Sequence, residues 1–351
     1  MDGSVPRTVV VSAVNIRKGG TLTILRDCLK YLSGLAVAGE YKVVALVHKR
    51  SLCDYPGIEY IEIPWSAKGW DRRLWCEYVT MHRISKDLAK REGRPVYMWL
   101  SLHDTTPRVV AEHQEVYCQT SFPFLKVRAR DWLMDPKVPL FALFTRWAYR
   151  INVKRNDCLI VQQEWFRDAL ARLLRLPVAK FRVIPPRMPD FSLIKPSDIH
   201  YDVPMFFYAA SADCHKNFET LCEAAKLLEV EVGKGRFKVV LSISGNENRY
   251  ARWIYKKWGL VDSIDFVGYM SREDLFGLYK AANAFVFPSR VETWGLPISE
   301  YLSVTGGKGR LLLADLPYAR GVAAEAPGAK YFPATDAKAL ERLMYESIAT
   351  G

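Results

Sequence analysis

The sequence predicts an α/β protein with two doubly wound parallel sheets, and three observations support this fold class. Short runs of β-branched, leucine and aromatic residues alternate with helix-length amphipathic stretches, as expected of a parallel sheet that is covered by helices. The alternation stops between residues 185 and 204, where five prolines occur, and then starts again. At 351 residues the chain is long for one domain and sufficient for two. We therefore expect two Rossmann-like domains, residues 1–187 and 188–351, joined by a proline-rich hinge and separated by an interdomain cleft.

In the first predicted domain, five short runs favour buried strands because β-branched and aromatic side chains pack well on a pleated surface. They are TVVVSAV (8–14), KVVALVH (42–48), PVYMWL (95–100), EVYCQ (115–119) and DCLIVQ (157–162). Helix-length segments such as TLTILRDCLKYL (21–32) lie between most of them. This order, strand then helix then strand, predicts a parallel sheet.

The second predicted domain repeats the same order. Its expected elements are MFFYAA (205–210), a helix over 217–230, KVVLSISG (238–245), a helix over 247–258, IDFVG (264–268), a helix over 271–281, AFVFPS (284–289), a helix from about 296, and RLLLAD (310–315). A last helix is expected in DAKALERLMYESI, shortly before Gly351.

Composition excludes several classes of protein. Half of the residues are hydrophobic and a quarter are charged, so the chain can build packed cores. No apolar stretch approaches the roughly 18 residues that span a bilayer, and the first seven residues lack the layout of a secretory signal. The seven cysteines are scattered, with no C-x-x-C pair, so we expect a reduced, cytoplasmic protein without a zinc site.

The stretch FVFPSRVETWGLPISEYL (285–302) holds the most informative polar residues. A buried strand is followed by a helix start, the place where open α/β sheets bind ligands and where helix N–H groups suit a phosphate. Gly295 allows a ligand to approach the backbone. Glu292 can accept hydrogen bonds from sugar hydroxyls, and Glu300 can hold the two hydroxyls of a ribose because a carboxylate has two acceptor oxygens.

VETWGLPISEYL resembles the E-x7-E signature of glycosyltransferase family 4, and the resemblance covers most of the chain. NIRKGGTLTIL is similar to the family's glycine loop, and HKNFETLCEAAKLL to its phosphate-binding lysine segment. The resemblance implies a GT-B fold, a nucleotide-sugar donor, no cofactor, no metal, and retention of anomeric configuration. Together with the reading of the residues themselves, it leads us to expect donor binding by Gly19, Gly20, Lys216, Arg290, Thr293, Trp294, Gly295, Leu296 and Glu300. Catalysis is expected of Glu292 together with Gln119 or His103.

Two positions depart from the family pattern. Where many members have an arginine beside the phosphate lysine, this chain reads Ala209-Ala210-Ser211, and Arg290 is the substitute cation that we expect. Where the family often has a histidine, this chain has Gln119 at the end of a predicted strand. His103 follows another predicted strand and is the alternative residue at the reacting centre.

A basic segment over 126–155 interleaves eight basic residues with aromatic ones. This pattern is typical of docking on an anionic membrane surface, and equally of a core helix with a basic outer face. Docking would suit a lipid-linked acceptor at the inner face of the cytoplasmic membrane, as in the bacterial O-antigen, capsule and exopolysaccharide enzymes that the chain resembles.

The net charge of +12 fits a nucleic acid, a membrane, a phosphorylated small molecule or a solvated basic surface. No nucleic-acid-binding motif occurs, so we expect no nucleic-acid partner. The sequence predicts a hexosyl- or deoxyhexosyltransferase that acts on a glycan or lipid-linked saccharide. The alternative is a catalytically weak or inactive GT-B subunit that binds nucleotide sugars within a glycan assembly complex.

Overall fold

The computed structural model describes residues 6–188, 191 and 193–349. The chain forms two compact units: one from Met1–Thr120 with Phe144–Pro186, the other from Ser121–Leu143 with Arg187–Gly351. The predicted domain division at 187/188 keeps the segment 121–143 in the first domain, whereas its contacts group it with the second unit. The outermost residues of both predicted domains, and Pro189 of the predicted hinge, lie outside the described residues.

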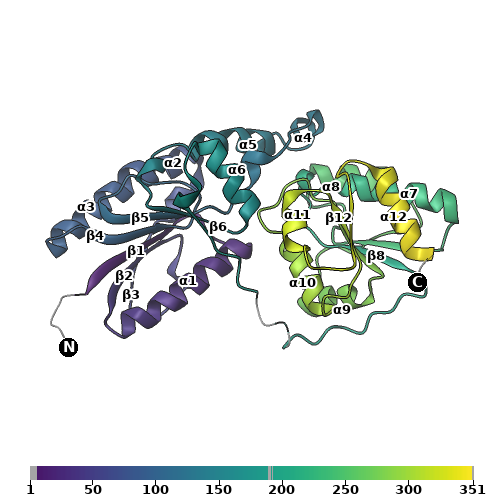
Figure 1. Ribbon diagram of the computed structural model, residues 1–351, viewed down its shortest axis with the longest axis horizontal. Helices are drawn as coiled ribbons and strands as arrows, with labels where there is room; N and C mark the ends of the chain where they lie inside the picture. Colours follow the sequence, from purple (N-terminus) through teal and green to yellow (C-terminus); the bar gives the residue numbers. More distant parts are fainter. Residues whose placement is uncertain (1–5, 189–190, 192, 350–351) are drawn as a thin grey trace. The chain divides into compact units, whose positions relative to one another are not determined.

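The first unit is built around a seven-stranded parallel sheet with the order β3-β2-β1-β4-β5-β6-β7 (Figure 1). Its strands are β1 (Arg7–Ala13), β2 (Tyr41–Val47), β3 (Ile58–Glu62), β4 (Val96–Ser101), β5 (Ala111–Tyr117), β6 (Cys158–Val161) and β7 (Phe181–Val183). Its helices are α1 (Gly19–Val37), α2 (Trp70–Trp75), α3 (Met81–Glu92), the last turn of α5 (Lys137–Ala148) and α6 (Glu164–Leu174).

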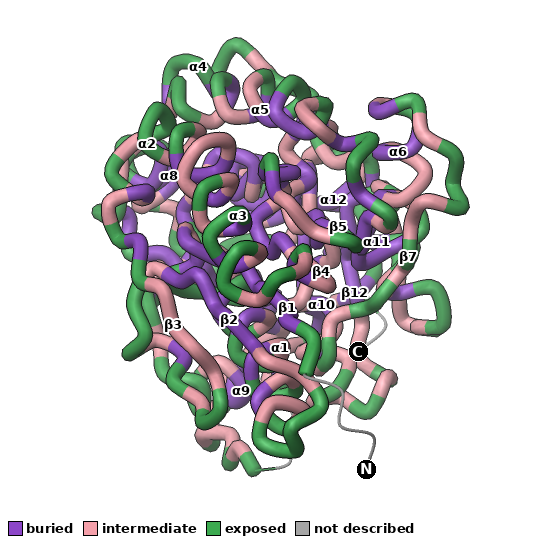
Figure 2. The backbone as a smooth tube through the Cα atoms, turned by 90° about the vertical axis from the view of Figure 1, so that its left-hand side faces the viewer, coloured by how far each residue is buried: buried purple, intermediate pink, exposed green. Residues whose placement is uncertain are grey.

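Alternating side chains of this sheet form a core on each face. Val11 and Ala45 pack with Leu25 and Leu29 of α1. Their neighbours point the other way, and Val10 belongs to the cluster that contains Met81 of α3. This period of two is that of a strand covered on both faces, and β1 and β2 are accordingly mostly buried in Figure 2.

The second unit has a six-stranded parallel sheet with the order β10-β9-β8-β11-β12-β13. Its strands are β8 (Met205–Tyr208), β9 (Lys238–Leu241), β10 (Ile264–Phe266), β11 (Ala284–Phe287), β12 (Leu311–Ala314) and β13 (Ala329–Phe332). Its helices are α4 (Ala129–Met134), most of α5, α7 (Phe218–Val232), α8 (Arg249–Trp258), α9 (Arg272–Ala281), α10 (Leu296–Val304), α11 (Pro317–Val322) and α12 (Ala337–Ala349).

The predicted α/β class with two doubly wound parallel sheets is confirmed. Three strands were not predicted, namely β3, β7 and β13, and all three lie at an edge of a sheet. Only one face of an edge element needs to be apolar and the strand can be short, so its sequence lacks the continuous hydrophobic run of a central strand. β3, with the sequence IEYIE, is partly exposed along its whole length.

No helix among the described residues is both long and apolar enough to cross a membrane.

Candidate functional site

The centre of the second sheet brings Lys216 and Glu292 together. Strand β8 lies between β9 and β11, and β8 and β11 are parallel. After β8 the chain continues to β9 on one side of β8, whereas β11 lies on the other side. Lys216 lies in the short 3-10 turn Cys214–Lys216 beyond β8, and Glu292 lies in the loop after β11. Both loops leave the carboxyl edge of the sheet at the point where strand order reverses, which is where open α/β sheets bind ligands.

The Lys216 Nζ donates a hydrogen bond to Glu292 Oε1 at 2.5 Å, and Ser289 Oγ donates to the same oxygen at 2.6 Å. Each side chain of the Lys216–Glu292 pair is only 16% exposed. Two further bonds tie the loops together: Asn217 Nδ2 donates to the Pro288 carbonyl at 2.9 Å, and the Arg290 N–H donates to the His215 carbonyl at 2.8 Å. The two loops therefore fix the pair in place.

Helix α10 follows this loop and carries Glu300. The helix begins after Gly295, which has φ +94° and whose added Cβ would meet Ile298 Cδ1 at 3.2 Å. Glycine is therefore required there for the turn as well as for space. Glu300 accepts a hydrogen bond from the Tyr279 hydroxyl at 3.3 Å and lies 3.5 Å from an Arg272 nitrogen. Burial raises the pKa of Glu300, an effect that Arg272 partly offsets.

The other predicted donor-binding residues of this stretch lie beside these two carboxylates. Trp294 is partly buried, and its Nε1 donates to Ser299 Oγ at 2.9 Å. Thr293 and Leu296 are also partly buried. The segment from Glu292 to Glu300 is thus one loop and one helix start, as the sequence predicts.

Arg290, predicted to be a phosphate-binding cation, forms a buried ion pair with Asp131. Its Nη2 lies 2.5 Å from Asp131 Oδ1 and its Nη1 lies 3.1 Å from Oδ2, and the two side chains are 5% and 3% exposed. The same two nitrogens also donate to the carbonyls of Cys214 and Lys126. The terminal nitrogens of Arg290 are therefore occupied by groups of the protein.

Asp131 belongs to the segment 121–143, which no sequence pattern indicates to be near this site. Arg130 of the same segment lies 3.2 Å from Glu219 Oε1 and over the ring of Trp253. Phe122 contacts the ring of His215 edge to face. Burial, with the charges of Lys216 and Arg290, holds the pKa of His215 well below its ordinary range. The segment thus packs directly against the loop that carries Lys216.

In the first unit, His103 and Gln119 lie in adjoining loops at the carboxyl edge of the sheet. The Gln119 Nε2 donates to the Leu102 carbonyl at 2.6 Å. Asp104, at φ +72°, accepts from the N–H groups of Gln119 and Thr120 and from the Tyr149 hydroxyl. Strand β5 ends at Tyr117, so Gln119 follows the strand instead of ending it. Gln119 is partly buried, whereas the His103 side chain is only 2% exposed.

His103 contacts a buried carboxylate that sequence reasoning missed. Its Nδ1 lies 3.3 Å from Glu77 Oε1, and Arg73 Nε donates to the same oxygen at 2.8 Å. Burial alone would raise the pKa of Glu77, but Arg73 and His103 outweigh it and lower this pKa to about 2. Glu77 stands in the π-helical turn Cys76–Thr80 that joins α2 to α3. Such turns are frequent at functional sites, but no sequence pattern predicts where a π-helical turn occurs.

The predicted glycine loop begins α1. Gly19 has φ +70°, and Gly19 and Gly20 are exposed. Asn15 and Arg17, just before them, line a cavity of about 240 Å³ together with Trp70 and Arg73. Both side-chain amide atoms of Asn15 are buried without a hydrogen-bond partner among the described residues, so this cavity offers polar groups to a ligand.

Within the described part of the chain, no three His, Cys, Asp or Glu side chains are grouped so that they could hold a metal ion.

Residues 191–306 match the model of the family described as "Glycosyl transferases group 1". Among curated proteins, O-antigen chain mannosyltransferase B from Escherichia coli is 37% identical over 103 residues, which cover 27% of this chain and 25% of that protein. The matched region therefore spans about a quarter of the length of this curated relative.

Several solved structures resemble nearly the whole chain. Sucrose-phosphate synthase from Thermosynechococcus elongatus gives a TM-score of 0.63 at 16% identity, covering 98% of this chain and 90% of that one. WaaG, a glycosyltransferase involved in lipopolysaccharide biosynthesis, gives 0.64 at 13% identity, covering 97% and 90%. At such identities the likeness establishes the fold. Residues 191–306 thus resemble glycosyl transferases group 1, and the chain as a whole has the GT-B fold, with two parallel α/β units.

Proposed function

We propose that the chain is a retaining, metal-independent glycosyltransferase that moves a hexose or deoxyhexose from a nucleotide sugar to a glycan or lipid-linked saccharide. One observation supports this proposal above the others. The Lys216–Glu292 pair lies at the switch point of the second sheet, inside the segment that matches glycosyl transferases group 1. A cation for the diphosphate and a carboxylate for the sugar thus stand side by side where a donor is expected.

Lys216 can hold the donor without losing Glu292. An ammonium group has three N–H donors, so Lys216 can bind a diphosphate oxygen while it donates to Glu292 Oε1. Because Lys216 and Ser289 both donate to Oε1, we assign Oε2 of Glu292 to a sugar hydroxyl. The amino end of α10 adds partial positive charge for the phosphates, and Glu300 on the same helix accepts the two ribose hydroxyls.

In the proposed reaction, the acceptor hydroxyl oxygen bonds to the anomeric carbon on the face from which the diphosphate oxygen departs. The hydroxyl proton passes to that departing oxygen, so the enzyme needs no nucleophile and the anomeric configuration is retained. The protein contributes position and charge stabilisation. Lys216 and the α10 amino end balance the charge of the leaving diphosphate, and we propose no role for a divalent metal.

Gln119 is the residue that we place nearest to the reacting sugar from the first unit. It is partly buried at a carboxyl edge, whereas His103 is enclosed by Glu77, Ser12 and Thr105. We therefore propose that His103 and its carboxylate stiffen the loop that Gln119 contacts. The Gln119 amide can both donate and accept hydrogen bonds from sugar hydroxyls.

The setting that we propose is bacterial surface polysaccharide synthesis on the inner face of the cytoplasmic membrane. The curated relative is an O-antigen chain mannosyltransferase. The basic segment 126–155 exposes apolar side chains that a core helix would bury, and these are Trp132, Leu133, Leu140, Leu143 and Trp147, at 44% to 57% exposure. Exposed tryptophan and leucine among basic residues are typical of a surface that docks on anionic lipid.

A nucleotide-release assay over a panel of UDP-, GDP- and dTDP-sugars tests the proposal, with GDP-mannose as the first donor. We expect acceptor-dependent release with one donor. Lys216→Met should remove this release, while Lys226→Met, which removes the same charge from an exposed position on α7, should retain it. Donor binding in calorimetry without release by any acceptor preparation would favour the inactive binding subunit.

A further inference from the structure

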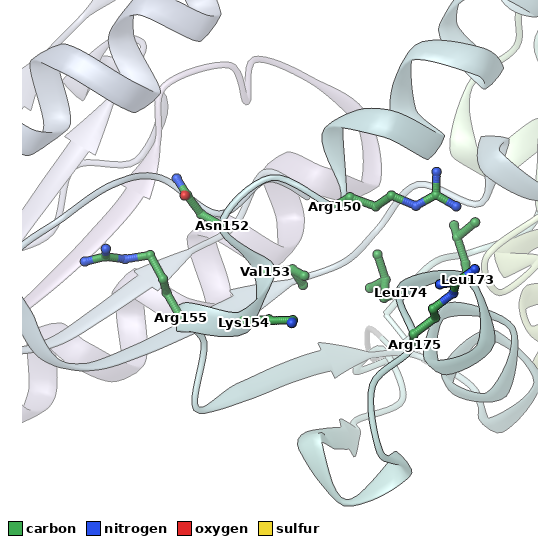
Figure 3. A pocket seen from close by; sticks show the side chains of 8 residues that line it. All are labelled: Arg150, Asn152, Val153, Lys154, Arg155, Leu173, Leu174 and Arg175. Carbon is green, nitrogen blue, oxygen red and sulfur yellow. The ribbon is translucent and has the colours of Figure 1, made fainter.

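A cavity in the first unit gathers cationic side chains away from the site described above. Its volume is about 560 Å³, and residues of 150–155 and 173–175 line it (Figure 3). The first stretch precedes β6 and the second precedes β7, so the cavity lies at the amino edge of the sheet. His103 and Gln119 lie at the carboxyl edge, where substrates of open α/β sheets bind. The cavity therefore lies at the opposite edge of the sheet from the two side chains of the first unit that we consider for the reaction.

Three cations in this cavity have no partner in the described part of the protein. The side chains of Arg150, Lys154 and Arg175 are exposed and make no hydrogen bond or ion pair with any described residue. Arg155 differs, because its Nη2 donates to the Val109 carbonyl at 3.0 Å and its guanidinium points away from the other three (Figure 3). No Asp or Glu stands among the described residues that line the cavity.

The charge in the cavity can be estimated from its surroundings. Helices α5 and α6 end at Ala148 and Leu174, and each helix end carries about half a negative charge. Together they offset roughly one of the three unpaired cations, which leaves an excess of about two positive charges. A phosphate monoester carries about 1.5 to 2 negative charges at pH 7 and matches this excess.

The apolar floor of the cavity increases the attraction between these cations and an anion. Val153 and Leu174 are buried, Leu173 is partly buried, and in Figure 3 Lys154, Arg150 and Arg175 surround these leucines. An apolar floor lowers the local dielectric constant and increases the attraction of an anion. The backbone of Arg175 has φ +56°, a conformation that glycine usually adopts at a helix end. The planar guanidinium of Arg175 can bind two phosphate oxygens.

We propose that this cavity binds a phosphate monoester group, carried either by a soluble metabolite or by a lipid headgroup. The volume is within the roughly 300–1,000 Å³ of small-molecule sites, so the bound molecule extends beyond the phosphate. This site does not depend on the proposed transfer reaction.

The test compares three full-length proteins: wild type, a cavity triple variant and a control triple variant. The cavity variant is Arg150→Gln with Lys154→Gln and Arg175→Asn, because asparagine tolerates the left-handed conformation. The control removes three exposed cations of α3 and is Arg83→Gln with Lys86→Gln and Lys90→Gln. Both lower the net charge from +12 to +9. The probes are glycerol 3-phosphate in calorimetry, and phosphatidylcholine vesicles with and without phosphatidic acid in co-sedimentation.

We expect wild type and control to bind at least one phosphate monoester probe equally, and the cavity variant to bind it at least tenfold more weakly. Binding of glycerol 3-phosphate identifies a soluble ligand, and binding of phosphatidic acid vesicles alone identifies a lipid headgroup. Equal losses in both triple variants would mean that overall charge is responsible, and would overturn the proposal. Unchanged binding by the cavity variant, or no binding by wild type, would do the same. If the cavity variant does not fold, the exposed single variant Lys154→Gln against Lys86→Gln repeats the comparison.

Discussion

Replacing Asp131 tests whether the segment 121–143 holds the loops that carry Lys216 and Glu292 in place. Asp131→Asn keeps the shape of the side chain but removes the charge opposite Arg290. Removal of one partner from a buried ion pair costs about 3–5 kcal/mol, because the other charge is left uncompensated. The oxygen of the introduced amide can still accept one hydrogen bond, and the Lys126 and Cys214 carbonyls still accept from Arg290. We therefore expect the lower end of this range, about 3 kcal/mol.

Hydrogen exchange read by mass spectrometry measures this loss in the second unit alone. A cost of about 3 kcal/mol should speed the slowest exchange of β11 and α7 by on the order of 100-fold. The matched control is Asp315→Asn, which breaks a 2.8 Å pair with Arg320 that is about half exposed. Exposed pairs contribute about 0–1 kcal/mol, so this control should change exchange by less than tenfold.

A double variant separates the ion pair from other effects of the substitution. Asp131→Leu with Arg290→Met replaces both charges by apolar groups, and such replacements of buried pairs are often neutral. We expect it to recover most of the stability that either single substitution loses. If Asp131→Asn exchanged no faster than Asp315→Asn, or if the double variant lost the sum of the single losses, the ion pair would not be what holds the segment to these loops.

Four other results are expected. Glu300→Ala should weaken both nucleotide and nucleotide-sugar binding in calorimetry, whereas Glu292→Ala should preserve nucleotide binding and remove turnover. If Glu292→Ala weakened nucleotide binding and Glu300→Ala did not, the assignment of the two glutamates would be wrong. Because burial raises the pKa of Glu300, nucleotide affinity should fall on acidification at a higher pH than an ordinary glutamate would give. Sugar transfer should persist in EDTA, and a loss that manganese restores would refute metal independence. The pKa of Glu77 falls from its ordinary 4.5 to about 2, so its stabilisation is complete above 4.5 and is lost as the pH falls through about 2. Glu77→Gln should therefore lower the melting temperature at neutral pH and flatten its decline in acid. Gln119→Ala should slow transfer by roughly 5- to 150-fold, because it loses about 1–3 kcal/mol of hydrogen bonding in the transition state. If His103→Asn were inactive while Gln119→Ala stayed active, His103 would be the residue at the reacting centre.

Local sequence was enough to predict the central strands and the region that carries Glu292, Gly295 and Glu300. Central strands are apolar over their whole length, as in β8, β11 and β12, so their signal is independent of any partner. The residues from Glu292 to Glu300 lie in one loop and one helix start, and their spacing is visible in the chain. The predicted resemblance to a GT-B glycosyltransferase is confirmed by the match to glycosyl transferases group 1.

The interactions that sequence reasoning missed all join distant parts of the chain. Asp131 is 159 positions from Arg290, and nothing near either residue indicates the other. The position of Arg290 shortly before Glu292 predicts that it faces a phosphate, but its side chain is turned to an acid from another segment. Glu77 looks like an ordinary helical glutamate in sequence and becomes a buried partner of His103 only through the π-helical turn.

The place of the segment 121–143 in the second unit also affects how the protein is made on the ribosome. The chain leaves the first unit after Thr120, returns to it at Phe144 and leaves it again after Pro186. At about 5–20 residues per second, translation needs roughly 8 to 32 s to proceed from Asp131 to Arg290. During this interval Phe122 and Leu125, which later pack beside Val291, have been synthesised without the surface that covers them. Once β7 has been synthesised, every strand of the first sheet exists, yet Phe122 and Leu125 still lack Val291 as a packing partner.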